Sequence, residues 1–335
     1  MPTPKSAEWL DSVREEIIDP DRPIIDPHHH LWKTATMWGR YELEDLWADT
    51  ESGHNVEKTV FLDCHSSYRE DGPEHLRPIG ETEYIAAVAA ESARAEGKAT
   101  IAAIVSHANM LLGEAAEEVL MAHEEAGNGL FRGIRHAGPS DATGSLTNPG
   151  RGRPCPYSEA DFRTGVRTLG RLGYTYDTWH FHHQNRDFLK LAQAVPETTM
   201  VLDHFGTPLG VGAYAGRQEE IFAQWSDDIA AIAAACPNVV AKLGGLAMPD
   251  NGFGWDVAER PPTSDEFAEA QQRYYLHAIE CFGPDRCMFE SNFPVDKLSI
   301  SYPVLWNGLK KIVSGFSADE KHAMYYGTAA RVYRI

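Results

Sequence analysis

Three consecutive histidines follow a short apolar segment near the start of the chain. The sequence reads Ile-Ile-Asp-Pro-His-His-His over residues 24–30, and its apolar part predicts a strand. Because successive side chains alternate across a strand, His28 and His30 point to one side and His29 to the other. Two neutral imidazoles side by side at the end of a strand form half of a metal site. The alternative is a histidine run in a loop that has no chemical role.

More histidines occur at the ends of later apolar segments. They are His65, His107, His136, His180 and His204. Histidines at the protein surface are instead expected on helices, as for His123, His277 and His322. Some strand-end histidines will bond loop carbonyl groups, and we expect this structural role for His65 and His107.

The apolar segments alternate with amphipathic ones. Eight apolar runs predict strands, at 24–28, 59–65, 99–105, 129–136, 173–180, 199–204, 238–243 and 286–290. Helical patterns follow them, at 79–97, 113–126, 158–171, 185–195, 217–236, 264–283, 301–314 and 317–331. Strands that alternate with helices imply parallel pairing and right-handed crossovers.

Eight such units predict an α/β fold, a single (β/α)8 TIM barrel with enlarged βα loops. We place it at residues 22–335, after an N-terminal extension at 1–21 and with a C-terminal helix at its end. The strand ends of a barrel converge on one mouth, so histidines that are distant in sequence become neighbours there. A doubly wound open sheet is the alternative, but no Gly-x-Gly-x-x-Gly follows the first strand. The enlarged loops are expected at 33–55, 66–78, 137–157, 206–216 and 247–263.

Composition limits the partners of this chain. A net charge of -19 opposes binding to nucleic acid or to an anionic membrane. No apolar run is long enough to span a bilayer and the first residues lack a signal-peptide pattern, so we expect a cytoplasmic protein. The 5 cysteines are scattered without a Cys-x-x-Cys pair, which argues against a zinc ribbon and a disulfide framework. The expected partner is a small-molecule substrate, and a homo-oligomer stays open.

The arrangement of these residues resembles the amidohydrolase superfamily. More narrowly, it is similar to the amidohydrolase-related group of lactonases and non-oxidative aromatic decarboxylases. The motifs are Asp26-x-His28-x-His30, His180 after the fifth strand, Asp203-His204 after the sixth, 286–294 at the eighth and the closing helix that ends at 327–333. The resemblance covers residues 22–335 and implies a barrel with a metal-assisted active site.

By this resemblance, His28, His30 and His180 hold one divalent metal ion. Zinc is the first expectation, with manganese or iron as alternatives. The resemblance makes His204 a general acid/base or a further ligand. A bound divalent ion polarises a carbonyl group or lowers the pKa of bound water, and a nearby base then moves the proton.

The chain departs from the family pattern at the eighth strand. The group usually reads Gly-Ser-Asp-Trp-Pro there, and its Asp contacts the metal and acts as a base. Residues 290–294 of this chain read Glu-Ser-Asn-Phe-Pro, so Asn292 stands at the Asp position. An amide accepts no proton near neutral pH and is a weak ligand. Glu290 lies on the same strand face and could supply the carboxylate as catalytic group or ligand; the alternative is a buried ion pair with Lys242.

The substrate side is less specific. Arg135 and His136 end the fourth strand, and a guanidinium at the mouth suits a carboxylate-bearing substrate. Trp179 and other loop tryptophans could form an aromatic wall. Arg151 and Arg153 lie in a loop that could close over the mouth, although a solvated loop arginine is the more ordinary interpretation.

Three functions agree with these patterns. The first is a metal-dependent hydrolase that opens a lactone or related cyclic ester of a carboxylated or aromatic-derived small molecule. The second is non-oxidative decarboxylation, or oxygenation by two metal ions, on the same scaffold. The third is a catalytically silent subunit of a hetero-oligomer, which Asn292 suggests. The many strand-end histidines favour an enzyme over a silent subunit.

Overall fold

The computed structural model describes residues 5–36, 38–141, 143–144, 146 and 155–335, and its centre is a sheet of eight parallel strands. In chain order and in sheet order these are β1 (Ile24–His29), β4 (Val56–Leu62), β5 (Thr100–Ser106), β6 (Phe131–Arg135), β7 (Thr175–Thr178), β8 (Met200–Leu202), β9 (Val239–Leu243) and β10 (Cys287–Phe289). A parallel bridge between His29 and Phe293 joins the two edges just past β10. The eight predicted strands are therefore present and form the predicted barrel.

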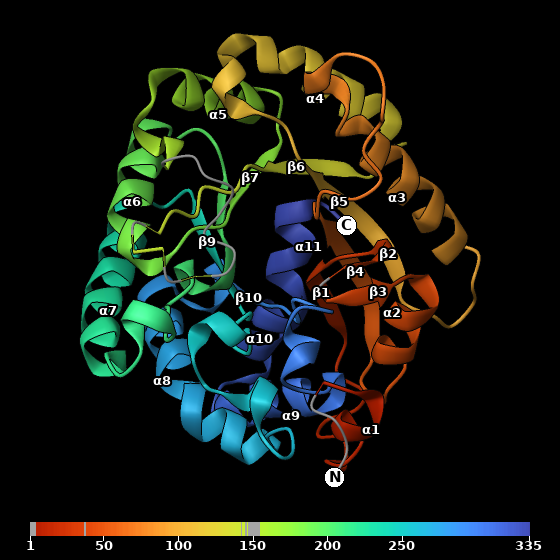
Figure 1. Ribbon diagram of the computed structural model, residues 1–335, viewed down its shortest axis with the longest axis vertical. Helices are drawn as coiled ribbons and strands as arrows, with labels where there is room; N and C mark the ends of the chain where they lie inside the picture. The colour runs from red at the N-terminus through yellow and green to blue at the C-terminus, as the bar shows by residue number, and fades with distance from the viewer. Residues whose placement is uncertain (1–4, 37, 142, 145, 147–154) are drawn as a thin grey trace.

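Helices surround the strands (Figure 1). They are α3 (Ile79–Ser92), α4 (Ala116–Ala126), α5 (Ala160–Arg171), α6 (Asn185–Ala194), α7 (Gln218–Ala235), α8 (Ser264–Phe282) and α9 (Tyr302–Ile312). The helix predicted at 317–331 is divided into α10 (Ala318–His322), a π-helical turn (Ala323–Gly327) and α11 (Thr328–Tyr333).

The C-terminal helix α11 closes one end of the barrel. In Figure 1 it lies within the ring of strands. Val332 and Tyr333 belong to the same buried cluster as the inward-facing residues Ile25 and Val60. The Tyr333 hydroxyl donates to Asp177 Oδ2 at 2.6 Å inside the barrel. The functional site is therefore expected at the other end of the barrel, at the C-terminal ends of the strands.

The segment at 33–55, predicted as an enlarged βα loop, contains regular structure. It contains the antiparallel pair β2 (Trp32–Thr36) and β3 (Gly39–Tyr41), followed by α2 (Leu43–Thr50). Buried Trp32, Tyr41, Leu43 and Leu46 join one apolar cluster, which provides the free energy to order this segment. The N-terminal segment contains α1 (Ala7–Leu10).

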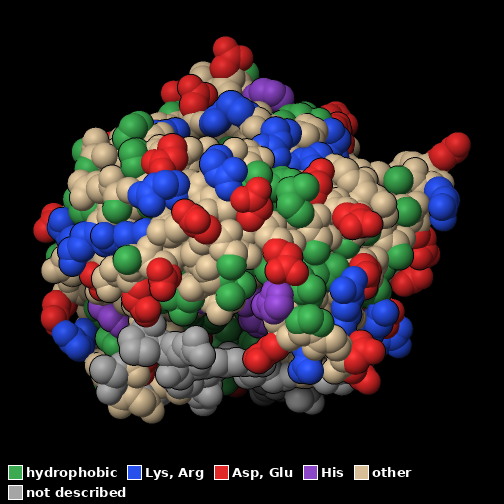
Figure 2. All heavy atoms as spheres, turned by 90° about the horizontal axis from the view of Figure 1, so that it is seen from above, with side chains coloured by type: hydrophobic (Ala, Val, Ile, Leu, Met, Phe, Trp, Pro, Cys, Tyr) green, Lys and Arg blue, Asp and Glu red, His purple; other side chains and the backbone are tan. Residues whose placement is uncertain are grey.

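Charges are mixed on the face of the molecule shown in Figure 2. Lysine and arginine side chains are interspersed with aspartate and glutamate, and neither sign gathers in one area of this face. No helix in the described part of the chain is long and apolar enough to cross a membrane.

His123 on α4 is buried, contrary to the surface position expected from the sequence. It lies on the same helix face as Ala116, Val119 and Leu120, which pack toward the barrel. The Thr82 hydroxyl lies 2.8 Å from His123 Nδ1, and His123 Nε2 donates to the His107 carbonyl at 2.9 Å. The spacing of His123 from the apolar residues of this helix face could have predicted its burial.

Burial lowers the pKa of His123 from 6.5 to about 4, and this predicts a loss of stability in acid. The unfolded chain takes up a proton below about pH 6.5, whereas the folded chain takes it up only near pH 4. The contribution of neutral His123 to the free energy of unfolding is therefore complete above the pKa of the unfolded chain. It is lost as the pH falls toward the pKa of His123 in the folded chain. Between about pH 7.5 and about pH 5 the wild type should lose about 2 kcal/mol more than His123→Gln in urea unfolding. Parallel losses in the two proteins would contradict the prediction, and the exposed His322→Gln is the control.

Candidate active site

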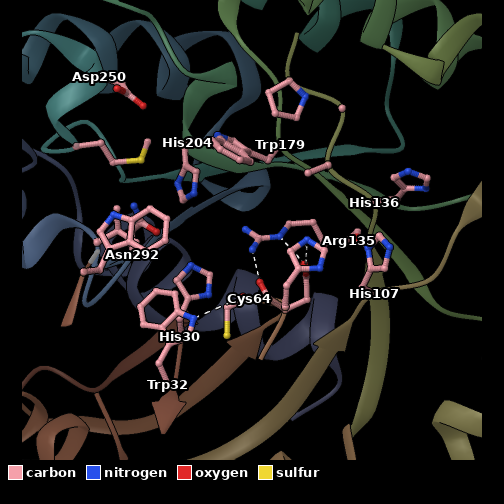
Figure 3. Close-up of a pocket in the computed structure, with 18 of the residues that line it drawn as sticks. His30, Trp32, Cys64, His107, Arg135, His136, Trp179, His204, Asp250 and Asn292 are labelled. Carbon is pink, nitrogen blue, oxygen red and sulfur yellow. Dashed lines mark hydrogen bonds and ion pairs between the residues drawn. The ribbon is translucent and has the colours of Figure 1, made fainter. Parts of the chain in front are cut away.

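A cavity of about 710 Å³ lies at the end of the barrel where the strands finish (Figure 3). Its described lining comes from the ends of most strands and the loops that follow them. The lining includes His30, Asp63, His65, His107, Arg135, His136, Trp179, His204 and Asn292. Of the residues predicted from the sequence, His28 and Glu290 lie beneath this lining and are fully buried.

Glu290 lies between two histidines at the base of the cavity and is hydrogen-bonded to one of them. Its Oε1 accepts from His204 Nδ1 at 2.7 Å, and its Oε2 lies 2.7 Å from His28 Nδ1. The rings of His28 and His204 are tilted by 42° to each other, with centroids 4.5 Å apart. We call His28, His204 and Glu290 the floor cluster. One ligand atom from each of the three lies within 4.8 Å of the others.

Two glycines make room for the floor cluster. A Cβ atom on Gly244 would lie 2.4 Å from Glu290 Cγ, and one on Gly245 would lie 2.3 Å from His204 Nδ1. Gly245 also has a positive φ of 73°, which favours glycine. His204 itself has a φ of 52°, and this left-handed turn after β8 sets the direction of its side chain.

Burial determines the protonation of the floor cluster. It raises the pKa of Glu290 to about 8, although Lys242 and Arg135 act in the opposite direction. It lowers the pKa of His204 to about 3, so this imidazole is neutral near pH 7. It also lowers the pKa of His28 well below its ordinary value. Because His204 Nδ1 is bonded to Glu290, Nε2 is the ring nitrogen that remains for chemistry.

His30 and Arg135 both reach His28 from the cavity side. His30 Nδ1 donates to the Leu62 carbonyl at 3.0 Å, so its Nε2 carries a lone pair. That Nε2 lies 3.3 Å from His28 Nε2. Arg135 Nη1 lies 3.4 Å from the same His28 nitrogen. His29 faces the other way and packs against Phe61, as the alternation of the strand predicts.

Arg135 is a buried cation with carboxylates on two sides. Its Nε donates to Asp63 Oδ1 at 2.7 Å, its Nη2 donates to the Asp63 carbonyl, and its Nη1 lies 3.7 Å from Asp203 Oδ2. Burial lowers the pKa of Arg135, but Asp63 and Asp203 outweigh it and raise that pKa. Two of its three nitrogens are therefore bonded to Asp63. Fewer N–H groups remain for the bidentate contact with a substrate carboxylate that the sequence suggested.

The other sequence candidates at the mouth lie at the cavity lining. Asn292 has a φ of 56°, and its Nδ2 donates to Asp296 Oδ1 at 2.8 Å. His136 Nδ1 accepts from the Met110 amide at 3.0 Å. Trp179 Nε1 donates to Thr207 Oγ1 at 3.1 Å. Arg151 and Arg153 lie outside the described residues.

His180 is placed apart from the floor cluster, and its predicted role as a ligand stays a prediction. Its Nε2 is bonded to Asn185 Oδ1 at 2.9 Å, and its Nδ1 lies 3.1 Å from Thr178 Oγ1. Its ring packs against Tyr157 and Phe188, and it is absent from the described lining of the cavity. Because β7 ends at Thr178, the turn and not the strand alternation sets the direction of His180. The structure therefore does not bring His180 together with His28, His204 and Glu290.

Asp63 was not singled out from the sequence, and it is central to the site. It follows β4 and pairs with Arg135 from β6. Burial raises the pKa of Asp63, but Arg135, His65 and His107 outweigh burial and hold it at about 2. His107 has the structural bond expected for it, from Nδ1 to the Arg135 carbonyl at 3.0 Å, and it also lines the cavity. The signal for Asp63 was its place at a predicted strand end, two residues before a histidine.

The floor cluster meets the chemical requirements of a divalent metal site. His28 Nδ1 and Glu290 Oε2 are buried and 2.7 Å apart, but they are not aligned as a hydrogen bond. His30 adds a lone pair 3.3 Å from the second nitrogen of His28. Imidazole nitrogens and a carboxylate form the donor set that zinc and other first-row divalent ions prefer.

Comparisons with known proteins show the family. The sequence model of the Amidohydrolase family (Amidohydro_2) matches residues 25–335. The chain is 31% identical to "Uncharacterized protein y4mH" of Sinorhizobium fredii, over 94% of this chain and 99% of the relative. It is 29% identical to the L-fucono-1,5-lactonase of Burkholderia multivorans, over 93% and 96% of the two chains. Structures of a Burkholderia multivorans amidohydrolase, one with bound HEPES and one with bound zinc, match with a TM-score of 0.71 and 25% identity, over 93% of this chain and 99% of theirs.

The chain belongs to the amidohydrolase family, because the match extends over nearly its whole length. It is an enzyme of the hydrolase type that acts on a small molecule. The barrel and the family resemblance expected from the sequence are confirmed. The family and the zinc-bound neighbour support a divalent metal as cofactor, and they leave its identity open.

Proposed function

We propose that this enzyme hydrolyses the lactone of a small hydroxylated acid. The observation that carries the proposal is the pairing of His204 with Glu290 on the floor of a cavity that also contains the Arg135 guanidinium. A base and a fixed cation within one enclosed site are the groups that opening a cyclic ester requires. The similarity to an L-fucono-1,5-lactonase over 93% of this chain supports the same reaction.

His204 is proposed as the group that moves the proton. It lines the cavity, whereas His28 and Glu290 lie beneath it, so His204 is the floor-cluster member that substrate can reach. Glu290 Oε1 fixes Nδ1, and Nε2 takes the proton of the attacking water and later gives it to the leaving alkoxide.

Arg135 is proposed to stabilise negative charge on the carbonyl oxygen. Asp63 and Asp203 hold its guanidinium in place, so little reorganisation is needed when charge develops. A divalent ion held in the floor cluster, at His28 Nδ1 and Glu290 Oε2, would supply further polarisation of the carbonyl group and lower the pKa of the attacking water. Both proposed ligands belong to the predicted set, and His204 of that set acts as base.

The charges of the described lining favour a neutral, hydroxylated ring over a dicarboxylate. Two lining cations are paired in the described structure, Arg135 with Asp63 at 2.7 Å and Lys5 with Asp256 at 3.1 Å. Asp63 and the imidazoles of His65, His107 and His136 offer donors and acceptors that suit hydroxyl groups. Trp32 and Trp179 offer an apolar surface for the face of a sugar ring.

The proposal predicts turnover of sugar-acid lactones. Fucono-, rhamnono-, galactono- and glucono-lactones should be tested beside 2-pyrone-4,6-dicarboxylate, with acid release followed by a pH indicator. We expect at least one sugar-acid lactone to be hydrolysed with a higher kcat/KM than the dicarboxylate. Preference for the dicarboxylate would reverse the substrate assignment. If none of the lactones is hydrolysed and carbon dioxide is released from an aromatic acid, decarboxylation would replace hydrolysis as the proposed reaction.

A further inference from the structure

A second group of possible metal ligands lies at the wall of the cavity. It consists of Asp63 just past β4, His65 two residues later and His107 just past β5. One ligand atom from each lies within 4.8 Å of the others, and none of the three belongs to the floor cluster. We call these residues the wall cluster. All three line the cavity (Figure 3 labels His107).

Each side chain of the wall cluster is oriented by a bond at its other polar atom. His107 Nδ1 donates to the Arg135 carbonyl at 3.0 Å, which makes Nε2 a lone-pair nitrogen. His65 Nδ1 is bonded to the Tyr68 hydroxyl at 2.8 Å, and His65 Nε2 lies 3.6 Å from Asp63 Oδ2. Asp63 Oδ1 accepts from Arg135 Nε at 2.7 Å. Such second bonds orient the imidazoles and carboxylates of metal sites.

The separation of Asp63 and His65 fits a shared cation better than a direct bond. At 3.6 Å the two atoms are too far apart for a good hydrogen bond. Two ligand atoms that each lie about 2.0–2.2 Å from one ion are separated by roughly this distance in a tetrahedral site. His65 has a φ of 57°, and this left-handed conformation turns its ring back toward the strand ends.

Charged groups surround the wall cluster, and Asp63 is its own carboxylate. Arg135 is the cation beside it, and Asp203 lies 3.7 Å from the Arg135 guanidinium. The Asp63 carboxylate is buried, with 2% of the residue exposed, and it is bonded to Arg135. Glu81 is also buried, and its Oε1 accepts from the Ser66 amide at 2.7 Å close to the same strand end. Asp203 also pairs with Lys242 at 3.2 Å, and burial raises the pKa of Glu81 to about 8, so Asp63 is the carboxylate that balances Arg135 here.

We propose that Asp63, His65 and His107 bind a divalent transition-metal ion at a site of their own, with its open side toward the cavity. Two imidazoles and one carboxylate suit zinc, cobalt, manganese or iron, and they are poor ligands for magnesium or calcium. Three protein ligands leave a position for water or for a substrate oxygen. The site is separate from the floor cluster and does not depend on which reaction the enzyme catalyses.

The test is a titration of chelator-treated protein with Co²⁺, read by calorimetry and by visible absorption. His65→Ala and His107→Ala should each weaken one binding event by about a hundredfold or more, because the loss of a ligand exceeds the loss of an outer hydrogen bond. His28→Gln, which changes the floor cluster, should leave that event in place. His75→Ala is the matched control, because His75 Nε2 lies 3.6 Å from Glu118 Oε2 and its side chain is 37% exposed, close to the values for His65.

Equal Co²⁺ binding by wild type, His65→Ala and His107→Ala would overturn the proposal. Loss of all binding in His28→Gln, with normal binding in the wall variants, would also overturn it, because the ion would then belong to the floor cluster. Anomalous scattering from cobalt-soaked wild-type crystals avoids any folding defect of the variants. A cobalt peak in contact with Asp63 and the two imidazoles supports the site, and no peak there rejects it.

Discussion

His204→Asn should reduce the kcat of lactone hydrolysis by at least about a hundredfold. Asparagine is close in size to histidine and can still bond with Glu290, but it accepts no proton near neutral pH. The loss should appear in kcat with little change in KM, because His204 is proposed to act on the proton in the transition state. The measurement is steady-state hydrolysis of the best lactone of the substrate panel, with circular dichroism to check folding.

Two further variants sharpen this result. His322→Asn changes an exposed histidine on α10 and should keep wild-type turnover. Glu290→Gln keeps the shape of the buried side chain but removes the titratable carboxyl group beside His204 Nδ1, so it should lose activity in the same direction. Unchanged turnover in His204→Asn would remove its assigned role and would transfer the base to another residue of the cavity.

The sequence predicted the barrel because its signal is local and repeated. Each strand is a short apolar run, and each is followed by an amphipathic helix, so errors at single residues do not alter the order of the elements. The segment at 286–290 illustrates this, since β10 covers only Cys287–Phe289 and still occupies its predicted place. The hairpin formed by β2 and β3 was missed because its ordering depends on Trp32 and Tyr41 packing in a tertiary cluster.

The strand-end histidines were only partly predictable, for a related reason. Side-chain direction follows alternation inside a strand, and this places His28 and His29 correctly. Beyond the last strand residue, the turn determines the direction. His180 lies past the end of β7 and turns to Asn185, whereas His204 is held by its left-handed φ against Glu290. Such turns cannot be read from residue type alone.

The charges inside the barrel were the least predictable part. Lys242 was considered as an ion-pair partner for Glu290 in the sequence, but the structure pairs it with Asp177 at 2.8 Å and Asp203 at 3.2 Å. Asp177 lies in β7 and Asp203 just past β8, so the pairing depends on the sheet register. Glu290 is instead bonded to histidine, which gives its carboxylate a place in the site.

Lys242→Met should lower the free energy of unfolding by about 3–5 kcal/mol. Lys242, Asp177 and Asp203 are fully buried, and Asp203 is also 3.7 Å from Arg135. Burial lowers the pKa of Lys242, but the two aspartates and Glu290 outweigh it and raise that pKa, so the lysine is charged in the folded protein. Methionine fills a similar volume but leaves two buried carboxylates without their cation. The measurement is urea unfolding of the wild type and the variant near neutral pH.

Two further variants distinguish the loss of a buried cation from the loss of a lysine side chain in general. Lys190→Met removes an exposed ion pair with Asp187 at 3.0 Å and should cost at most about 1 kcal/mol. Adding Asp203→Asn to Lys242→Met removes one of the stranded charges and should recover part of the lost stability. Since Asp203 also steadies Arg135, the double variant should regain stability without regaining full activity. Equal, small losses in Lys242→Met and Lys190→Met would show that the buried charges are not coupled as the distances imply.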